Sequence, residues 1–401
     1  MAFILVLNAG SSSIKFAVFN AATGPNSLNL ILRGHAAQAG ADIELSIKDA
    51  DGGTLERQQK ISDNTTFDHD DAIDSILTWL GAHRAEFVPV AVGHRVVHGG
   101  EKYSIPVVVT EEVLQDIEAL VPLAPLHQPH NLKLIHLIRK RWPAIPQIAC
   151  FDTAFHSTQT REAKAFALPR ELTNAGIRRY GFHGLSYEYL ASQLPQVLGD
   201  HAAGKVIVAH LGSGASLCAL QNGKSVATTM GFSALDGLMM GTRCGTLDPG
   251  VVLYLLQHLH MSPEKISALL YQRSGLLGVS GISSDMRLLL TSTDPHASEA
   301  IDLFVYRIIG EIGMLVALMG GVDAIVFSAG IGENSPPIRS RICAGFTWLG
   351  ASMDETANSA DLELIHTPAS TMQLAIVPTD EEKMIALHTQ NWIKKKAQKV
   401  Y

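Results

Sequence analysis

Two segments of the chain, half a chain length apart, each run from an apolar strand through a turn of small residues into a second strand. The first covers residues 3–19 with its turn at 9–13, and the second covers residues 206–220 with its turn at 212–214. Glycine and serine in such turns let the backbone approach an anion closely and offer it N–H and hydroxyl donors. One hairpin of this kind in each half predicts a duplicated architecture that grips a polyphosphate between two lobes.

Composition is typical of a globular protein with an ample core. The 401 residues predict two or three domains at roughly 150 residues each. Hydrophobic residues make up 47%, and the net charge of -7 argues against a nucleic-acid scaffold, which usually carries a basic face. The four cysteines are scattered without a CxxC pair, which predicts a protein of the reducing cytoplasm.

The longest apolar stretch, residues 301–321, is long enough to span a membrane, but it contains charged residues. It contains Asp302, Arg307 and Glu311, so we expect a long, mostly buried helix and a soluble protein without a membrane segment. The apolar N-terminal run has no basic region before it and is expected to form a buried strand, not a signal peptide.

Strand-like and helix-like patterns alternate along the chain, which predicts α/β lobes. Thr110 is expected to cap one helix, and Asp248 with Pro249 to open another. The last helix is expected to fold back on the first lobe, so that residues 1–152 and 383–401 form one domain and 153–382 the other. The expected strands are 3–8, 14–19, 28–33, 43–48, 88–97, 145–151, 205–210, 216–220 and 323–327, and the expected helices are 71–80, 111–120, 131–142, 263–271, 285–292, 298–319 and a last one from about 380.

Asn8 stands at the end of the first strand and faces the turn at 9–13. Its amide oxygen is suited to coordinate a hard cation or to accept from a metal-bound water, and Lys15 returns toward the phosphates. An ordinary hairpin of small residues explains the same segment. Residues 210–216 and 330–334 are two further candidate phosphate-binding turns, although neither matches GxxxxGK[ST] and the second lacks full GxGxxG spacing.

Two arginines lie among glycines, Arg95 within 93–100 and Arg243 within 241–245. A guanidinium on such a loop can swing onto a carboxylate or phosphate and bind it through two hydrogen bonds. The commoner alternative for either arginine is a solvated surface side chain.

Three histidines are weighed in the same way. His183 stands just before a predicted helix, where it either donates to an equatorial phosphoryl oxygen or packs as a structural residue. His94 and His98 have i, i+4 spacing without a third ligand, so we interpret them as structural.

The start of the last helix carries two neighbouring glutamates. Thr379 and Glu382 have the spacing of a capping box, which would explain Glu382 as helix architecture. Glu381 is left without a structural task and is a candidate ligand for a metal or its water.

Six motifs, taken in chain order, resemble the acetate kinase family over residues 3 to about 390. The resemblance implies the actin, sugar kinase and Hsp70 superfamily: an α/β protein of two actin-like (ribonuclease H-like) lobes with duplicated topology and an ATP cleft between them. The motifs are Leu7-Asn8-Ala-Gly10-Ser-Ser-Ser13-Ile-Lys15, Gly93-His-Arg95-Val-Val97-His-Gly-Gly100, Phe151-Asp152-Thr-Ala-Phe-His156, Gly181-Phe-His183-Gly184, Gly241-Thr-Arg243 and Gly330-Ile-Gly-Glu-Asn334.

The resemblance further implies reversible transfer of the γ-phosphate of ATP to acetate, giving acetyl phosphate and ADP, with propionate kinase as the alternative. It implies Mg²⁺ or Mn²⁺, ATP as co-substrate, and a homodimer that binds neither nucleic acid nor membrane. The roles it implies are metal binding by Asn8 and Glu381, catalysis by Asp152, His183 and Arg243, substrate binding by Arg95, Val97, Leu126 and Phe182, and ATP binding by Lys15, His210, Leu211, Gly212, Ser213, Gly214, Asp285, Met286, Arg287, Gly330, Ile331, Gly332, Glu333 and Asn334.

The chemistry of a carboxylate acceptor agrees with these roles. A carboxylate is already an anionic nucleophile, so the reaction needs relief from repulsion between two anions more than a strong base. We therefore expect Asp152 mainly to orient an arginine or histidine, although the family is often described with this aspartate as proton acceptor. The rival from another class is a non-catalytic, ATP-switched clamp of the Hsp70 or actin type, which would not need Arg95.

The chain departs from the family at three places. It has Ser213 where the family usually has asparagine, residues 128–130 read Gln-Pro-His for the usual Asn-Pro-Pro, and Ala234 replaces the usual proline. Ala234 removes bulk near the expected acyl pocket, which predicts some tolerance of propionate.

Overall fold

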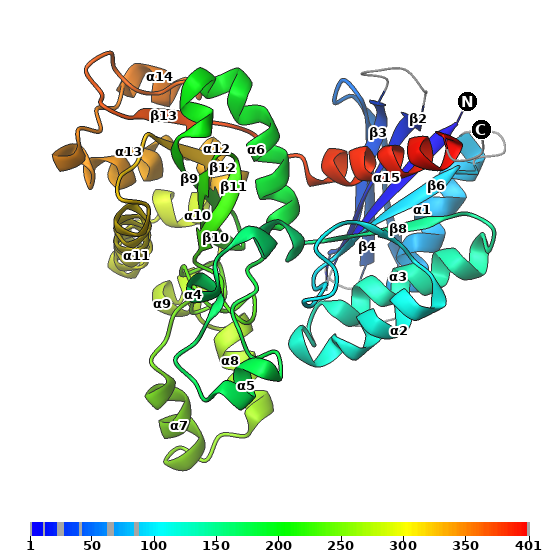
Figure 1. The fold of residues 1–401 in the computed structure, drawn as a ribbon, viewed down its shortest axis with the longest axis horizontal. Coiled ribbons are helices and arrows are strands. Elements are labelled where there is room, and N and C mark those ends of the chain that lie inside the picture. The colour runs from blue at the N-terminus through cyan, green and yellow to red at the C-terminus, as the bar shows by residue number, and fades with distance from the viewer. Residues whose placement is uncertain are drawn as a thin grey trace. The chain divides into compact units, whose positions relative to one another are not determined.

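The computed structural model describes residues 2–10, 13–21, 28–39, 42–61, 68–83 and 88–398. The chain forms two compact units, Met1–Ala154 with Asp380–Tyr401 and Phe155–Thr379 (Figure 1). The domain boundaries expected after residues 152 and 382 stay a prediction. Across the described ranges, no helix combines the length and the apolar character that crossing a membrane requires.

The first unit contains a sheet whose described strands follow the order β5-β4-β3-β2-β1-β6-β8-β7. Strands β1 to β5 are joined antiparallel, whereas β1, β6 and β8 run parallel. The elements are β1 Phe3–Ala9, β2 Ser13–Ala21, β3 Leu28–Ala39, β4 Asp42–Asp49, β5 Thr54–Ile61, α1 His69–His83, β6 Ala91–Val96, β7 Val107–Val108, α2 Glu111–Ala119, η1 Val121–Leu123, α3 Gln128–Arg141, β8 Gln147–Phe151 and α15 Glu381–Gln398.

Helices cover both faces of this sheet. Leu7 of β1 and Val92 of β6 share a buried cluster with apolar residues of α1 and α3. The helix α15 packs on β1 and β6, where it crosses the strands in Figure 1. The close approach needs Gly93, because a Cβ there would lie 2.5 Å from Thr389 Oγ1 and 2.6 Å from Ile385 Cγ2. The C-terminal helix therefore folds back on the first sheet, as expected.

The second unit contains a sheet with the strand order β11-β10-β9-β12-β13. The helix α6 covers one face, where Tyr187 and Leu190 pack against Val208 and Val326. The elements are η2 Ala154–Thr158, α4 Arg161–Lys164, α5 Arg170–Asn174, α6 Gly184–Leu198, η3 Gly199–Ala203, β9 Lys205–Leu211, β10 Ala215–Gln221, β11 Lys224–Thr228, α7 Pro249–Gln257, α8 Pro263–Gln272, α9 Gly275–Ser280, α10 Met286–Thr291, α11 Pro295–Met319, β12 Ala324–Ser328, α12 Ala329–Asn334, α13 Pro336–Ala344, η4 Thr347–Leu349, α14 Glu355–Ser359 and β13 Gln373–Ile376.

The two sheets repeat one topology, which confirms the predicted duplication. The order β3-β2-β1-β6-β8 corresponds to β11-β10-β9-β12-β13. In each series the central strand pairs antiparallel with its hairpin partner and parallel with the next strand. Both predicted hairpins are present, β1 with β2 and β9 with β10, although residues 11 and 12 of the first turn lie outside the described residues.

Two of the predicted helix caps are confirmed. Thr110 Oγ1 accepts from the Val113 N–H at 3.2 Å before α2, and Asp248 Oδ1 accepts from the Gly250 N–H at 2.7 Å before α7. The predicted long helix over the apolar stretch is α11. The expectation that it is mostly buried is wrong, because only its face toward the core is buried and Tyr306, Met314 and Leu318 are exposed.

The expected capping box at the last helix is wrong. Asp380 caps α15, because its Oδ1 accepts from the Lys383 N–H at 2.9 Å. Thr379 is engaged elsewhere: its Oγ1 lies 2.7 Å from Ser186 Oγ and its N–H donates to Glu333 Oε1. Glu382 therefore has no capping role. A second difference is that residues 330–334 form the short helix α12 and not an open turn.

Candidate active site

Polar side chains end three neighbouring strands of the first unit. Asn8 lies in β1, Arg95 in β6 and Asp152 directly after β8, and the parallel pairing of these strands places all three at one edge of the sheet. Arg95 lies two residues after Gly93 in β6, so both residues face the same side of the sheet, which is the side that α15 covers. The first turn of α15 brings Glu381 to the same place.

Arg95 and Asp152 form a close, largely buried ion pair. Arg95 Nη2 and Nε donate to Asp152 Oδ2 at 2.6 and 3.0 Å. Arg95 Nη1 lies 3.4 Å from Asn8 Oδ1, and Arg95 Nε lies 4.0 Å from Glu381 Oε2. Asp152 is 1% exposed, and its Oδ1 has no hydrogen-bond partner among the described residues. The geometry is that of a carboxylate that orients a guanidinium.

Burial changes how the Asp152 carboxyl titrates. Removal from water raises the pKa of Asp152 to about 6, and the nearby Glu381 carboxylate raises it too, while attraction to Arg95 acts in the opposite direction. The group therefore gains or loses its charge within reach of neutral pH.

Two glutamate carboxylates from the first turn of α15 lie beside Asn8. Asn8 Nδ2 donates to Glu381 Oε2 at 3.2 Å and to Glu382 Oε1 at 3.3 Å. No group of three or more His, Cys, Asp or Glu side chains in the described part of the chain is arranged to hold a metal. Mg²⁺, however, keeps several waters and takes only one or two carboxylates, so Glu381 and Glu382 are enough carboxylate ligands for it, while Asn8 Oδ1 lies near Arg95 Nη1. Lys15 pairs with Asn8 across β1 and β2 and shares its face of the sheet.

Residues predicted to bind the acyl group fall in both units. Val97 follows β6, is 2% exposed, and donates its N–H to Asn131 Oδ1 of α3 at 3.0 Å. Leu126 lies half-buried in the turn between η1 and α3. Phe182 belongs to the second unit, is also buried, and its carbonyl accepts from His156 Nε2 at 2.9 Å.

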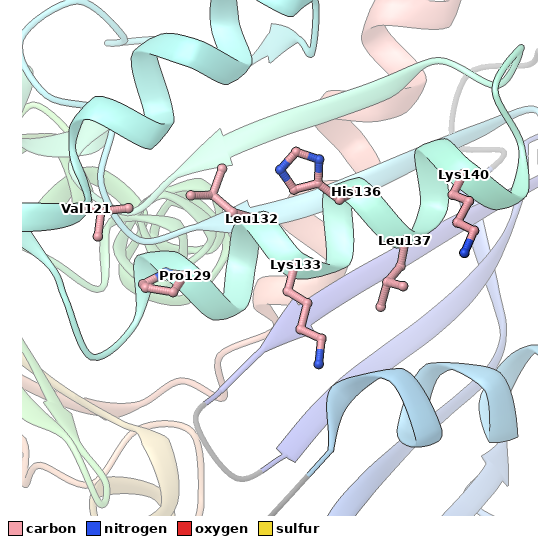
Figure 2. Close-up of a pocket in the computed structure, with 7 residues that line it drawn as sticks. All are labelled: Val121, Pro129, Leu132, Lys133, His136, Leu137 and Lys140. Atoms are coloured by element: carbon pink, nitrogen blue, oxygen red, sulfur yellow. The ribbon is translucent and has the colours of Figure 1, made fainter.

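A groove of about 510 Å³ lies on the outer side of α3, and it is separate from these residues. Figure 2 shows the side chains that line it. One of them, Lys133, forms ion pairs with Asp68 at 3.2 Å and with Asp70 at 2.7 Å. Val97 and Leu126 are not among the residues that line it, which are Val121, Pro129, Leu132, Lys133, His136, Leu137 and Lys140.

In the second unit, His183 and Arg243 converge on Gly214. A methyl group at Gly214 would lie 3.2 Å from His183 Nε2 and 3.7 Å from Arg243 Nη1. Arg243 Nη1 also donates to the Ala234 carbonyl at 3.0 Å, a contact that the usual proline would keep. His183 precedes α6 with a left-handed backbone, φ +58°. Two cationic or donor side chains thus face one turn of the β9–β10 hairpin.

Three buried hydroxyls form a network with the histidines here: Ser186 and Tyr187 were not predicted, and Ser216 was predicted only as a member of the turn 210–216. His183 Nδ1 lies 2.9 Å from Ser216 Oγ, and Ser216 Oγ lies 2.5 Å from the Tyr187 hydroxyl. The His183 and His210 rings stack at 4.3 Å, and His210 Nδ1 lies 2.9 Å from Ser186 Oγ. The available signal was the spacing of Ser186 and Tyr187, three and four residues after His183 on the predicted helix.

Residues 210–214 and 330–334 meet at one edge of the second sheet. β9 and β12 run parallel with His210 opposite Ser328, and a Cβ at Gly212 would lie 3.9 Å from the Gly330 nitrogen. Glu333 Oε1 holds the start of α12 by accepting from the Ala329 N–H at 2.7 Å. Of the remaining members, Leu211 is buried, Ser213 is exposed, Ile331 and Gly332 lie within α12, and Asn334 Nδ2 donates to the Gly330 carbonyl at 2.9 Å.

The segment 285–287 adjoins the same turn. Gly241 lies between this segment and the turn at 212–214, because a Cβ at Gly241 would lie 3.4 Å from the Ser213 carbonyl oxygen and 3.4 Å from Ser284 Cβ. Asp285 caps α10 and accepts from Arg287 Nη2 at 2.6 Å, while Met286 is buried. The structure therefore gathers three of the predicted ATP-binding segments within one unit.

Two α/β units that repeat one strand order define a two-domain protein of the actin-like ATPase class. The Acetokinase family model matches residues 3–387, so the chain belongs to that family, which confirms the resemblance. The chain is 54% identical over 388 residues to an acetate kinase of Rhodopseudomonas palustris, covering 96% of this chain and 97% of that protein.

Two solved structures are similar over almost the whole chain. A propionate kinase from Francisella tularensis is 36% identical with a TM-score of 0.89, covering 98% of this chain and 100% of the other. A Porphyromonas gingivalis acetate kinase is 37% identical with a TM-score of 0.85, at the same coverage.

Proposed function

We propose that this protein catalyses the reversible transfer of the γ-phosphate of ATP to acetate, giving acetyl phosphate and ADP. The observation that carries the proposal is the 54% identity to an acetate kinase over 96% of the chain. The acceptor is a carboxylate, and the Arg95 guanidinium at the strand ends of the first unit supplies the charge that would bind it.

In the proposed reaction the protein contributes positioning and positive charge. Arg95 binds the acetate carboxylate, and Asp152 keeps Arg95 in the required orientation through the two hydrogen bonds described above. His183 and Arg243 donate to the phosphoryl group in transit. Because acetate is already an anion, no proton has to be removed from it, and relief of repulsion is the main requirement.

The ATP-binding role rests on the gathered turns of the second unit. Backbone N–H groups at 212–214 and 330–334 would contact phosphates, with residues 285–287 beside them. Mg²⁺ or Mn²⁺, held by Asn8 and Glu381, would neutralise phosphate charge. Lys15, next to Asn8, would act on the same phosphates.

Propionate is the alternative acceptor, since one similar structure is that of a propionate kinase. Val97, Leu126 and Phe182 would line the acyl pocket, and Ala234 in place of a larger residue favours some propionate turnover. We also propose a homodimer, because α7 has no buried residue and exposes Leu253 and Tyr254. A cytoplasmic location stays a prediction.

The test is hydroxylamine trapping of the acyl phosphate formed from ATP with acetate, propionate or butyrate. We expect acetyl hydroxamate from acetate. At saturation, propionate should react more slowly than acetate but at more than about one percent of the acetate rate, which corresponds to a discrimination below about 2.7 kcal/mol. Arg95→Ala should abolish the product while ATP still binds. An ATPase that runs equally well without any carboxylic acid would instead indicate a clamp.

A further inference from the structure

A chain of two hydroxyls leads from the core of the second unit to His183. The Tyr187 hydroxyl lies 2.5 Å from Ser216 Oγ, which lies 2.9 Å from His183 Nδ1. Tyr187 and Ser216 are both 0% exposed, so no water competes for these contacts. Tyr187 is one helical turn after His183, and its N–H donates to the His183 carbonyl at 3.0 Å. Ser216 comes from β10 and pins the ring from the sheet side.

The direction of the hydrogen bonds follows from counting protons. Each hydroxyl has one proton to donate. If His183 Nδ1 donated to Ser216 and Ser216 donated to Tyr187, the phenolic proton would need a second acceptor. The described residues provide no other hydrogen-bond partner for the Tyr187 hydroxyl. A buried donor without an acceptor is costly, so the opposite direction is favoured, from Tyr187 to Ser216 to Nδ1.

We propose that Tyr187 and Ser216 are positioning residues that keep the neutral His183 ring in the tautomer with its proton on Nε2. Nε2 is the nitrogen that faces Gly214, 3.2 Å from where a Cβ would lie, where Arg243 Nη1 also converges. The relay therefore aims an N–H donor at the place where the proposed phosphoryl transfer would develop negative charge. This inference rests on the proposed function for its consequence, but the tautomer itself does not.

Burial is compatible with the assigned direction. It raises the pKa of Tyr187 well above 10, so the phenol keeps the proton that the outer donor of the relay needs. The stacked His210 ring, whose own Nδ1 contacts Ser186 Oγ at 2.9 Å, limits rotation of His183 from the other side.

The test combines a tautomer measurement with kinetics on the full chain. In ¹⁵N-histidine-labelled protein, assigned with His183→Gln, we expect a protonated Nε2 and an unprotonated Nδ1 at His183. Ser216→Ala should lower kcat for acetyl phosphate formation at least about tenfold, because a wrong tautomer misplaces the donor. The KM values for ATP and acetate should change less than about twofold, since the relay acts on the reacting state.

Tyr187→Phe removes only the outer hydroxyl and should lower kcat less, and it should add nothing in the Ser216→Ala background, because it acts only through Ser216. Thr228→Val is the matched control: its buried hydroxyl donates to the Leu217 carbonyl in the same sheet and should leave kcat unchanged. Rescue of kcat by Ser216→Thr would support the hydroxyl as the cause.

Two results would overturn the proposal: an Nδ1-protonated His183 in the unmodified protein, or kcat losses in Thr228→Val equal to those of Ser216→Ala. A protein that makes no acyl phosphate but shows the expected tautomer would refute the proposed function alone. Should Ser216→Ala fail to fold, Tyr187→Phe carries the kinetic test.

Discussion

Asp152 combines two demands that oppose each other. The negative charge of its carboxylate attracts the Arg95 guanidinium, and Arg95 Nη2 lies 2.6 Å from Asp152 Oδ2. Burial favours the neutral acid instead and raises the pKa of Asp152 to about 6. Above that pH the ionised form orients Arg95, and below it the neutral form holds the guanidinium less firmly. A side chain placed in this way should make substrate binding depend on pH in a range where an ordinary aspartate would not.

We therefore predict that kcat/KM for acetate falls as the pH drops through about 6, because Asp152 takes up a proton there. Asp152→Asn should lower kcat/KM at neutral pH and remove this limb of the profile. The measurement is a pH series of kcat/KM for both proteins. Acetate itself also titrates, and Asp152→Asn separates the two groups. If the variant shows the same inflection as the unmodified protein, the fall in kcat/KM belongs to acetate or to another group and not to Asp152.

Arg95 should be sensitive to shape as well as charge. Lysine keeps the charge but cannot present two parallel N–H groups to a carboxylate. Arg95→Lys is expected to raise the KM for acetate at least about tenfold, because one lost charge-assisted hydrogen bond costs about 1.5–3 kcal/mol. The KM for ATP should stay within about twofold in the same initial-rate series. A parallel rise in both values would indicate general distortion of the site.

At the level of elements, the packing of α15 on β6 fixes the position of the glutamates that lie beside Asn8. Because Glu381 and Glu382 lie in the first turn of α15, whatever displaces that helix also moves them away from Asn8. Gly93→Ala would place a Cβ 2.5 Å from Thr389 Oγ1, and we expect a loss of about 1–3 kcal/mol in the free energy of unfolding.

Urea unfolding measures this loss, with Gly81→Ala as the matched control. Gly81 lies in α1 of the same unit, and no atom lies within 4 Å of its Cβ position. Gly81→Ala should therefore raise the free energy of unfolding by about 0.5–1 kcal/mol. Equal stability of the two variants would contradict a close fit of α15 on β6.

The same elements indicate what a sequence can reveal. Caps at Thr110 and Asp248 were predictable because a cap is a local contact over two or three residues. The cap of α15 was not, since Thr379 and Asp380 both suit the position and contacts of Thr379 with Ser186 and Glu333 decide between them. The contact of Ser216 with His183 was missed for a related reason: it joins β10 to the residue before α6, a pairing that no local pattern encodes.

For the whole molecule, duplication explains why two turns of similar chemistry recur. Each unit repeats the order of a hairpin followed by two parallel strands, so each sheet presents its turn and its strand ends at one edge. The hairpins were readable from small residues after apolar runs, and the duplication followed from finding two. The family motifs supplied the expected roles of single residues, which topology alone does not specify.

Assembly is the remaining property at this scale, and α7 offers a test of the proposed homodimer. None of its residues is buried, and Leu253 and Tyr254 are 53% and 54% exposed in the single chain; Figure 1 shows α7 at the outer end of its unit. Exposed apolar side chains along one helix are typical of an interface. Light scattering should give twice the chain mass of 43.1 kDa for the unmodified protein and the chain mass for Leu253→Glu.

Ile105 provides the matched control, because it is 66% exposed in the other unit. Ile105→Glu adds the same charge to an apolar surface position, and it should leave the mass doubled if α7 forms the interface. A monomer in the unmodified protein would contradict the homodimer, and a dimer in Leu253→Glu would move the interface away from α7. Because a charge buried between two apolar surfaces without a partner is strongly unfavourable, one substitution at the centre of the interface is enough to separate these outcomes.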